Sequence, residues 1–95
     1  MRVVWSLGAQ EDAREIVALL LEQSEAAARR VAQEFAIAAE RLSDFPLLGM
    51  EADAASRRFL LVARGRYRLI YRVEGELLRI LGISLAPKPW SSERF

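Results

Sequence analysis

The stretch of sequence that decides the fold is YRLIYRV, at residues 67–73. Its apolar side chains alternate with positions that are mostly arginine, and a period of two is typical of a strand that buries one face. The face expected to be buried carries Tyr67, Leu69, Tyr71 and Val73, and the opposite face carries Arg66, Arg68, Ile70 and Arg72. Gly65 before the stretch and Glu74-Gly75 after it predict tight turns. We therefore expect residues 66–73 to be the middle strand of an antiparallel meander.

Neighbouring segments supply the other strands. Residues 57–64 and 77–83 are largely apolar and lie directly beyond the two turns. At the start of the chain, residues 3–5 are two valines and a tryptophan, which favour a short first strand. Residues 86–95 contain prolines, which are excluded from a sheet interior, so we expect them to form a C-terminal tail.

After a break at residues 6–8, a helix is predicted over residues 9–22. Its apolar residues recur at i, i+3, i+4 and i+7, which is the spacing of a buried helical stripe. This stripe comprises Ala13, Ile16, Val17 and Leu20. Leu19 and Leu21 flank the stripe and widen the apolar arc to roughly 200°, about twice what packing on a sheet alone requires. The excess is either covered by a second helix or left as an exposed patch that needs a partner.

The second helix is predicted to begin after Ser24, a favourable N-cap. It should end at Phe45-Pro46, because proline disfavours helical backbone in the residue before it. Its apolar seam, with spacings that alternate between three and four, comprises Ala28, Val31, Phe35, Ala38, Leu42 and Phe45. Such a seam suits antiparallel packing against the first helix. Residues 46–55 are expected to form a loop that turns at Gly49.

The resulting order is β-α-α-β-β-β, and the fold class is α+β: an N-terminal strand, a helical hairpin and a three-stranded antiparallel meander. With 95 residues the chain has the size of one domain, which we place over residues 1–95 with 86–95 as its tail. No apolar run approaches the roughly 20 residues that cross a bilayer. The N-terminus also lacks the pattern of a secretory signal, so we expect a cytoplasmic protein.

The composition excludes several kinds of chemistry. The sequence contains no cysteine and no histidine, which removes a disulfide framework, a thiolate nucleophile and the usual metal ligands. We therefore expect neither a metal nor a cofactor. The remaining candidates for proton transfer are Tyr67, Tyr71 and Lys88, whose side chains transfer protons poorly near neutral pH.

Charge is distributed unevenly along the chain. Residues 1–53 carry five arginines and ten acidic residues, whereas residues 54–95 carry eight arginines and one lysine against three acidic residues. The net charge of +1 therefore hides a dipolar molecule, which can steer a charged partner towards one side. The alternative is a solvated outer sheet face on which arginine stems cover apolar surface.

Four segments, taken in order, carry a family likeness. Residues 42–49 (LSDFPLLG) match a pattern of leucine, proline and glycine that closes a second helix, and residues 58–62 (RFLLV) begin with an arginine. Residues 67–73 match a tyrosine-rich third strand, and residues 78–83 (LRILGI) match a last strand. Together they resemble the ParE/RelE superfamily of toxins from bacterial type II toxin–antitoxin modules, and the ParE branch more than the RelE branch. After the last strand the chain departs from many relatives, because residues 85–88 (LAPK) replace a histidine followed by small and basic residues.

The resemblance implies one of two activities. ParE-like toxins inhibit DNA gyrase by binding it, whereas RelE-like toxins cleave messenger RNA on the ribosome. Cleavage requires one group to take a proton and another to give one, and this sequence supplies cations generously but proton transfer poorly. A net charge of +1 is also low for contact with ribosomal RNA. We favour a gyrase-inhibiting, non-hydrolytic toxin, and a ribosome-dependent endonuclease and an inactive antitoxin-binding relative stay open.

The resemblance also implies a partner, a ParD-like antitoxin that forms a hetero-oligomer with the toxin. Its amphipathic helix would lie in a groove and its extended segment would add to a sheet edge. For this groove we predict Val17, Leu20 and Leu21.

For the cellular target we predict a cationic surface and one aromatic residue of the tail. This set comprises Arg58, Arg64, Arg66, Arg68, Arg72, Lys88 and Trp90. The tyrosines alternate onto the opposite strand face, which argues against a base-stacking RNA platform. We expect neither direct nucleic-acid binding nor a membrane. Trp90 and Phe95 either pack back on the domain or carry the target contact.

Overall fold

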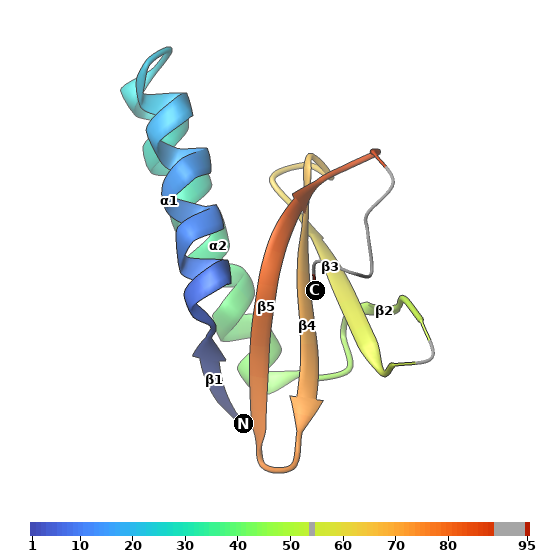
Figure 1. The fold of residues 1–95 in the computed structure, drawn as a ribbon. Coiled ribbons are helices and arrows are strands. Elements are labelled where there is room, and N and C mark those ends of the chain that lie inside the picture. Colours follow the sequence, from blue (N-terminus) through green and yellow to red (C-terminus); the bar gives the residue numbers. More distant parts are fainter. Residues whose placement is uncertain (54, 89–94) are drawn as a thin grey trace.

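The computed structural model describes residues 1–53, 55–88 and 95. Its elements are β1 (Arg2–Trp5), α1 (Leu7–Leu21), α2 (Glu25–Asp44), β2 (Met50–Glu51), β3 (Arg57–Val62), β4 (Tyr67–Glu74) and β5 (Leu77–Leu85). The strands form one mixed sheet in the order β1-β5-β4-β3-β2 (Figure 1). β1 runs parallel to β5, and the remaining neighbours are antiparallel. The predicted α+β class, with a helical hairpin followed by a meander, is confirmed.

Both helices begin at a serine cap. The Ser24 hydroxyl accepts a hydrogen bond from the backbone N–H of Ala27, as predicted, and the Ser6 hydroxyl accepts one from Ala9. The first strand ends at Trp5, as predicted, but the helix begins at Leu7 rather than at residue 9, because Ser6 is its N-cap. α2 ends at Asp44, directly before the Phe45-Pro46 pair that was expected to stop it.

The core lies between the helical hairpin and one face of the sheet. The α2 seam is buried at Ala28, Val31, Phe35, Ala38 and Leu42, and the facing strands contribute Tyr67, Leu69, Tyr71, Leu78 and Ile80. The prediction that Phe45 continues this seam was wrong, because its side chain is 64% exposed. Phe45 follows the last helical residue with a φ of −132°, which takes its side chain off the helical stripe.

β5 is bordered by two different elements along one edge. β1 pairs with it only as far as Ile80, and beyond that point α1 lies beside it. The Ser6 hydroxyl donates to the backbone carbonyl of Leu81 at 3.2 Å, and the buried Asp12 carboxylate accepts from the N–H of Ile83 at 2.9 Å. Side chains of α1 and its cap thereby replace the ladder bonds that a longer β1 would supply.

The sheet departs from the sequence prediction in several places. Residues 46–55, predicted as a loop, contain the two-residue strand β2, whose Met50 and Glu51 pair with Phe59 and Arg58. β5 runs to Leu85 rather than ending at residue 83. Ile70 lies on the arginine side of β4 and is nevertheless fully buried, close to a register shift between β4 and β5.

The end of the chain returns to the sheet. A Cβ on Gly82 would collide with the ring of Phe95, so this position accommodates only glycine while Phe95 is packed there. Of the two alternatives for the tail aromatics, Phe95 thus packs back on the domain. Trp90 lies outside the described residues. In the part of the chain that the structure describes, no helix has the length and apolar character needed to cross a membrane.

Candidate protein-interaction surfaces

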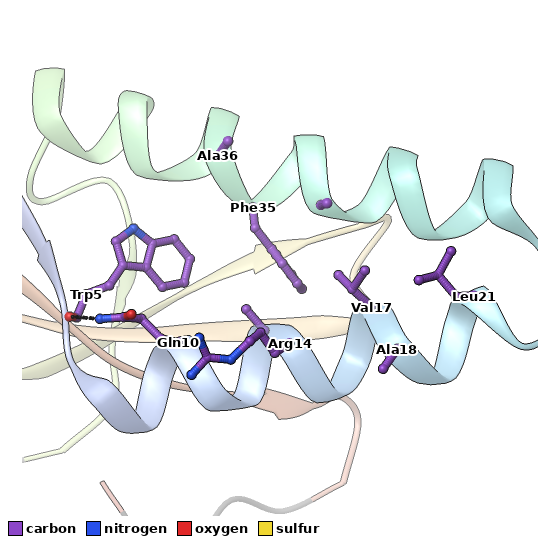
Figure 2. A pocket seen from close by; sticks show the side chains of 10 residues that line it. Trp5, Gln10, Arg14, Val17, Ala18, Leu21, Phe35 and Ala36 are labelled. Atoms are coloured by element: carbon purple, nitrogen blue, oxygen red, sulfur yellow. Dashed lines mark hydrogen bonds between the residues drawn. The ribbon is translucent and has the colours of Figure 1, made fainter.

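An open groove of ≈910 Å³ runs between α1 and α2. We call it the helical groove, and its lining residues are Trp5, Gln10, Ala13, Arg14, Val17, Ala18, Leu21, Ala32, Phe35 and Ala36. Figure 2 shows Trp5, Phe35 and Val17 reaching into the space between the helices. Most of the lining is apolar, so a ligand of this groove gains free energy chiefly by removing apolar surface from water.

Polar groups are confined to one end of the helical groove. The Gln10 amide donates to the backbone carbonyl of Trp5 at 3.1 Å, which ties the side chain down beside the strand (Figure 2). Arg14 is exposed, and among the described residues it makes no ion pair. The groove therefore combines an apolar length with a single cation near its Trp5 end.

The three residues predicted for antitoxin binding fall into different environments. Val17 and Leu21 line the helical groove, whereas Leu20 is half-buried and packs against the core. Leu19 and Leu21 remain 63% and 53% exposed, so α2 does not cover the excess apolar arc of α1. Of the two alternatives, the exposed patch is the one observed.

Sequence reasoning missed the part of the groove that α2 and β1 contribute. Trp5 was predicted as part of the first strand, and it both packs against the core and lines the groove. Phe35 was identified only as a seam residue, and its ring meets Tyr67 edge-on with centroids 5.7 Å apart. Nothing in the sequence marked Ala32 and Ala36 as groove residues. Their small side chains let a ligand approach the α2 backbone.

A second, closed arrangement surrounds Tyr71, and we call it the Tyr71 cluster, made of Pro46, Gly49, Arg58 and Tyr71. The Tyr71 hydroxyl accepts from the N–H of Gly49 and donates to the carbonyl of Pro46, both at 2.9 Å. The Arg58 guanidinium donates to the carbonyl of Gly49, also at 2.9 Å. These bonds hold the loop that follows α2 against β3 and β4.

Gly49 is the tightest point of the Tyr71 cluster. A Cβ at this position would lie 2.7 Å from the backbone oxygen of Phe59 and 2.7 Å from the Tyr71 ring and hydroxyl. The glycine was expected to provide a turn, but the structure requires it for close approach. Burial raises the pKa of Tyr71, and the bond from Gly49 and the charge of Arg58 oppose that shift only in part.

Arg58 was predicted to contact the target, and the structure places it in the Tyr71 cluster. Besides its bond to Gly49, its guanidinium lies 3.3 Å from a carboxylate oxygen of Glu51, and its side chain is 21% exposed. The charge of Arg58 is therefore engaged within the loop. Its role in target binding stays a prediction.

Two further predicted target residues, Arg68 and Arg72, are also held by the chain itself. Arg72 and the neighbouring Arg79, which was not among the predicted residues, both pair with Glu74, at 2.7 and 3.0 Å, and these two guanidinium groups lower the pKa of that carboxyl. Arg68 donates to the backbone carbonyls of Leu85 and Lys88, and its guanidinium lies 5.9 Å from the centre of the Phe59 ring. Three of the six predicted cations are therefore engaged within the chain.

The remaining predicted cations are exposed. Arg64 and Arg66 belong to the turn between β3 and β4, and Lys88 follows β5. A small pocket of ≈150 Å³ joins this turn to α2, and it is lined by Arg30, Val31, Glu34, Ala63, Arg64 and Arg66. Over residues 1–53, 55–88 and 95, no group of three or more acidic side chains is placed to hold a metal ion.

Comparison with known proteins identifies the family. The family model of the ParE toxin of the type II toxin–antitoxin system parDE matches residues 3–85. The chain belongs to the ParE toxin family. This toxin shares its fold with a solved structure described as the chromosomal ParDE toxin–antitoxin system from P. aeruginosa, at a TM-score of 0.73 and 20% identity. That match covers 90% of this ParE chain and 95% of the other. The comparison with curated proteins finds no match.

Two of the sequence segments that carried the resemblance to the ParE family meet in the Tyr71 cluster. The leucine, proline and glycine stretch at residues 42–49 carried part of the resemblance, and its glycine is the one that the Tyr71 cluster encloses. The tyrosine-rich strand carried another part, and its Tyr71 supplies the enclosing hydroxyl. Two segments that were separate signals in the sequence are thus one structural unit.

Proposed function

We propose that this ParE-family chain is a toxin that arrests growth by binding DNA gyrase, and that a ParD-like antitoxin neutralises it. The observation that carries this proposal is the family match over residues 3–85, because gyrase inhibition and a ParD partner are typical of that family. A type II toxin requires a protein partner, and the exposed apolar lining of the helical groove offers one a binding surface.

A mode of action by binding agrees with the chemistry of the described residues. The two tyrosines that were candidates for proton transfer are both buried in the core, at 5% and 0% exposure. The Tyr71 hydroxyl already makes two hydrogen bonds, and burial raises its pKa away from the range in which it would act as a base. Of the three residues that the sequence offered for proton transfer, only Lys88 is exposed.

We place the antitoxin in the helical groove. An amphipathic helix with apolar residues at i, i+3, i+4 and i+7 would lay them along Val17, Leu21 and Phe35. The Arg14 guanidinium near the Trp5 end would donate hydrogen bonds to an acidic side chain of that helix. Burial of the groove lining would stabilise the toxin as well as inhibit it, because a ligand that binds only the folded state shifts the folding equilibrium.

Two measurements test the proposal together. The purified chain should block supercoiling by gyrase, and addition of the protein encoded by a short reading frame next to the toxin gene should restore it. Expression without that partner should stop growth, with filaments and a DNA-damage response. Cleavage of messenger RNA at the ribosomal A site with supercoiling unaffected would instead identify an endonuclease. Harmless expression of the folded chain would identify an inactive, antitoxin-binding relative.

A further inference from the structure

The arginines of this protein divide into two groups. Arg58, Arg72 and Arg79 pair with carboxylates, and Arg68 is bound to backbone carbonyls. In contrast, Arg30, Arg64 and Arg66 make no ion pair with any residue that the structure describes, although they line one small pocket. These three guanidinium groups repel each other, and only one carboxylate, that of Glu34, lines the pocket with them, so a bound anion would reduce the remaining repulsion.

The backbone that presents two of these arginines is strained. Ala63, Arg64 and Gly65 have φ angles of 54°, 59° and 81°, in the left-handed region that disfavours residues with a Cβ. Glycine would be the favourable residue at position 64, yet the sequence has an arginine there. Ala63 adopts the same region, so the strain belongs to the turn as a whole, and the turn fixes the point from which the Arg64 side chain extends.

The pocket lies on a different flank of α2 from the helical groove. The groove uses Ala32, Phe35 and Ala36, whereas the pocket uses Arg30, Val31 and Glu34. At 3.6 residues per turn the two sets point in directions about 150° apart around the helix axis. A helix bound in the groove therefore leaves the pocket accessible.

We propose that Arg30, Arg64 and Arg66 form a binding site for the carboxylates of an acidic segment of a protein partner. Guanidinium groups match carboxylates in two-point geometry, and Glu34 in the same pocket would accept a hydrogen bond from the backbone N–H of the bound segment. The inference goes beyond the proposed function, because the site lies outside the helical groove. It does not depend on which cellular target the toxin has.

The charges around the site favour a peptide over a nucleic acid. A phosphate backbone is bound by a continuous stripe of free cations, and here the neighbouring arginines of the sheet are occupied by Glu51, Glu74 and backbone carbonyls. Glu34 disfavours a run of anionic groups of any kind, but a peptide can place a backbone N–H donor beside it, which a phosphate backbone cannot.

The test compares two double variants of equal charge by fluorescence anisotropy at low salt. The probe is a labelled glutamate-rich peptide, with a glutamine-substituted peptide and a short DNA duplex alongside it. Arg64→Gln/Arg66→Gln should weaken binding of the glutamate peptide by roughly five- to thirtyfold. The control Arg2→Gln/Arg41→Gln removes two exposed arginines outside the pocket and should bind as the wild type does.

Arg64→Gly separates binding from folding. It relieves the left-handed strain and should raise Tm by about 4–8 °C, while peptide affinity falls. Equal losses in the two double variants would overturn the proposal, because charge alone would then explain binding. Tighter binding of the duplex than of the glutamate peptide would also overturn it. Unaffected gyrase with specific peptide binding would reject only the proposed target.

Discussion

The Tyr71 cluster and the helical groove differ in how completely their space is filled and their groups are paired. In the cluster, there is no room for a methyl group on Gly49, and the Tyr71 hydroxyl both accepts and donates a hydrogen bond. In the groove, ≈910 Å³ stays open and Leu21 remains 53% exposed. The Tyr71 cluster is thus closed by its own contacts, whereas the helical groove leaves apolar surface that a partner can bury. Substitutions in the first region should act on folding, and substitutions in the second on binding.

The largest effect is expected for Gly49→Ala. Its Cβ would lie 2.7 Å from the Phe59 backbone oxygen and from Tyr71, and neither the strand nor the packed ring can withdraw without loss of other contacts. We expect the free energy of unfolding to fall by about 3 kcal/mol, measured by urea denaturation. Gly8→Ala is the matched control, because its nearest neighbour lies 3.8 Å away and it sits in α1. It should leave stability unchanged or raise it by up to about 0.5 kcal/mol.

Tyr71→Phe should come next. The substitution leaves the Gly49 N–H and the Pro46 carbonyl without their partner in a place that water reaches poorly, which should cost about 2 kcal/mol. Tyr67→Phe is the comparison, because the described structure shows no hydrogen bond from that hydroxyl. It should cost under about 0.5 kcal/mol. Equal losses from both would show that the hydroxyl bonds in the cluster contribute nothing specific.

Leu21→Asp tests the other region. The charged side chain would stand in the apolar lining of the helical groove, and we expect antitoxin affinity to fall by roughly ten- to thirtyfold in a calorimetric titration. Its stability should change little, because Leu21 is more than half exposed. Leu19→Asp is the control, since Leu19 is as exposed but does not line the groove. Unchanged affinity for Leu21→Asp would remove the antitoxin from this groove.

The smallest effect is a pH dependence at the arginine network. Arg72 and Arg79 lower the pKa of Glu74 in the folded chain, from an ordinary value of 4.5. A lowered folded pKa means that the stabilisation is present above the ordinary value and is lost as pH falls through the folded one. Arg57 lowers the pKa of Asp53 in the same direction. Glu74→Gln should therefore flatten the decline of stability below about pH 5, whereas Glu76→Gln should not.

How far the sequence predicted this structure depends on how local each signal was. Ser24, Pro46 and the seam from Ala28 to Leu42 act within one helix, and each appears as predicted. β2 was missed because two residues carry no periodicity, and the hairpin partner across from them decides that they form a strand. Only the α1 side of the helical groove was predicted, because the excess of apolar residues on α1 can be recognised from their spacing along that helix alone.

Two sets of predicted site residues lie in surroundings that local sequence does not reveal. Arg58 alternates onto an apparently solvated face, and nothing near it in sequence shows that Gly49 and Glu51 come close enough to bind it. Leu20 and Leu21 are adjacent in sequence, yet one packs on the core and the other lines the groove. For both, the outcome depends on where an element distant in the chain is placed.

The two helices, the four longer strands, the Ser24 cap and most of the buried faces were determined by the sequence alone, because periodicity, capping and turn chemistry act between residues a few positions apart. Which arginines keep a free charge, and which apolar residues stay open to a partner, was decided only in three dimensions. Both depend on contacts across the fold, where a carboxylate, a carbonyl or a second helix either reaches the side chain or does not.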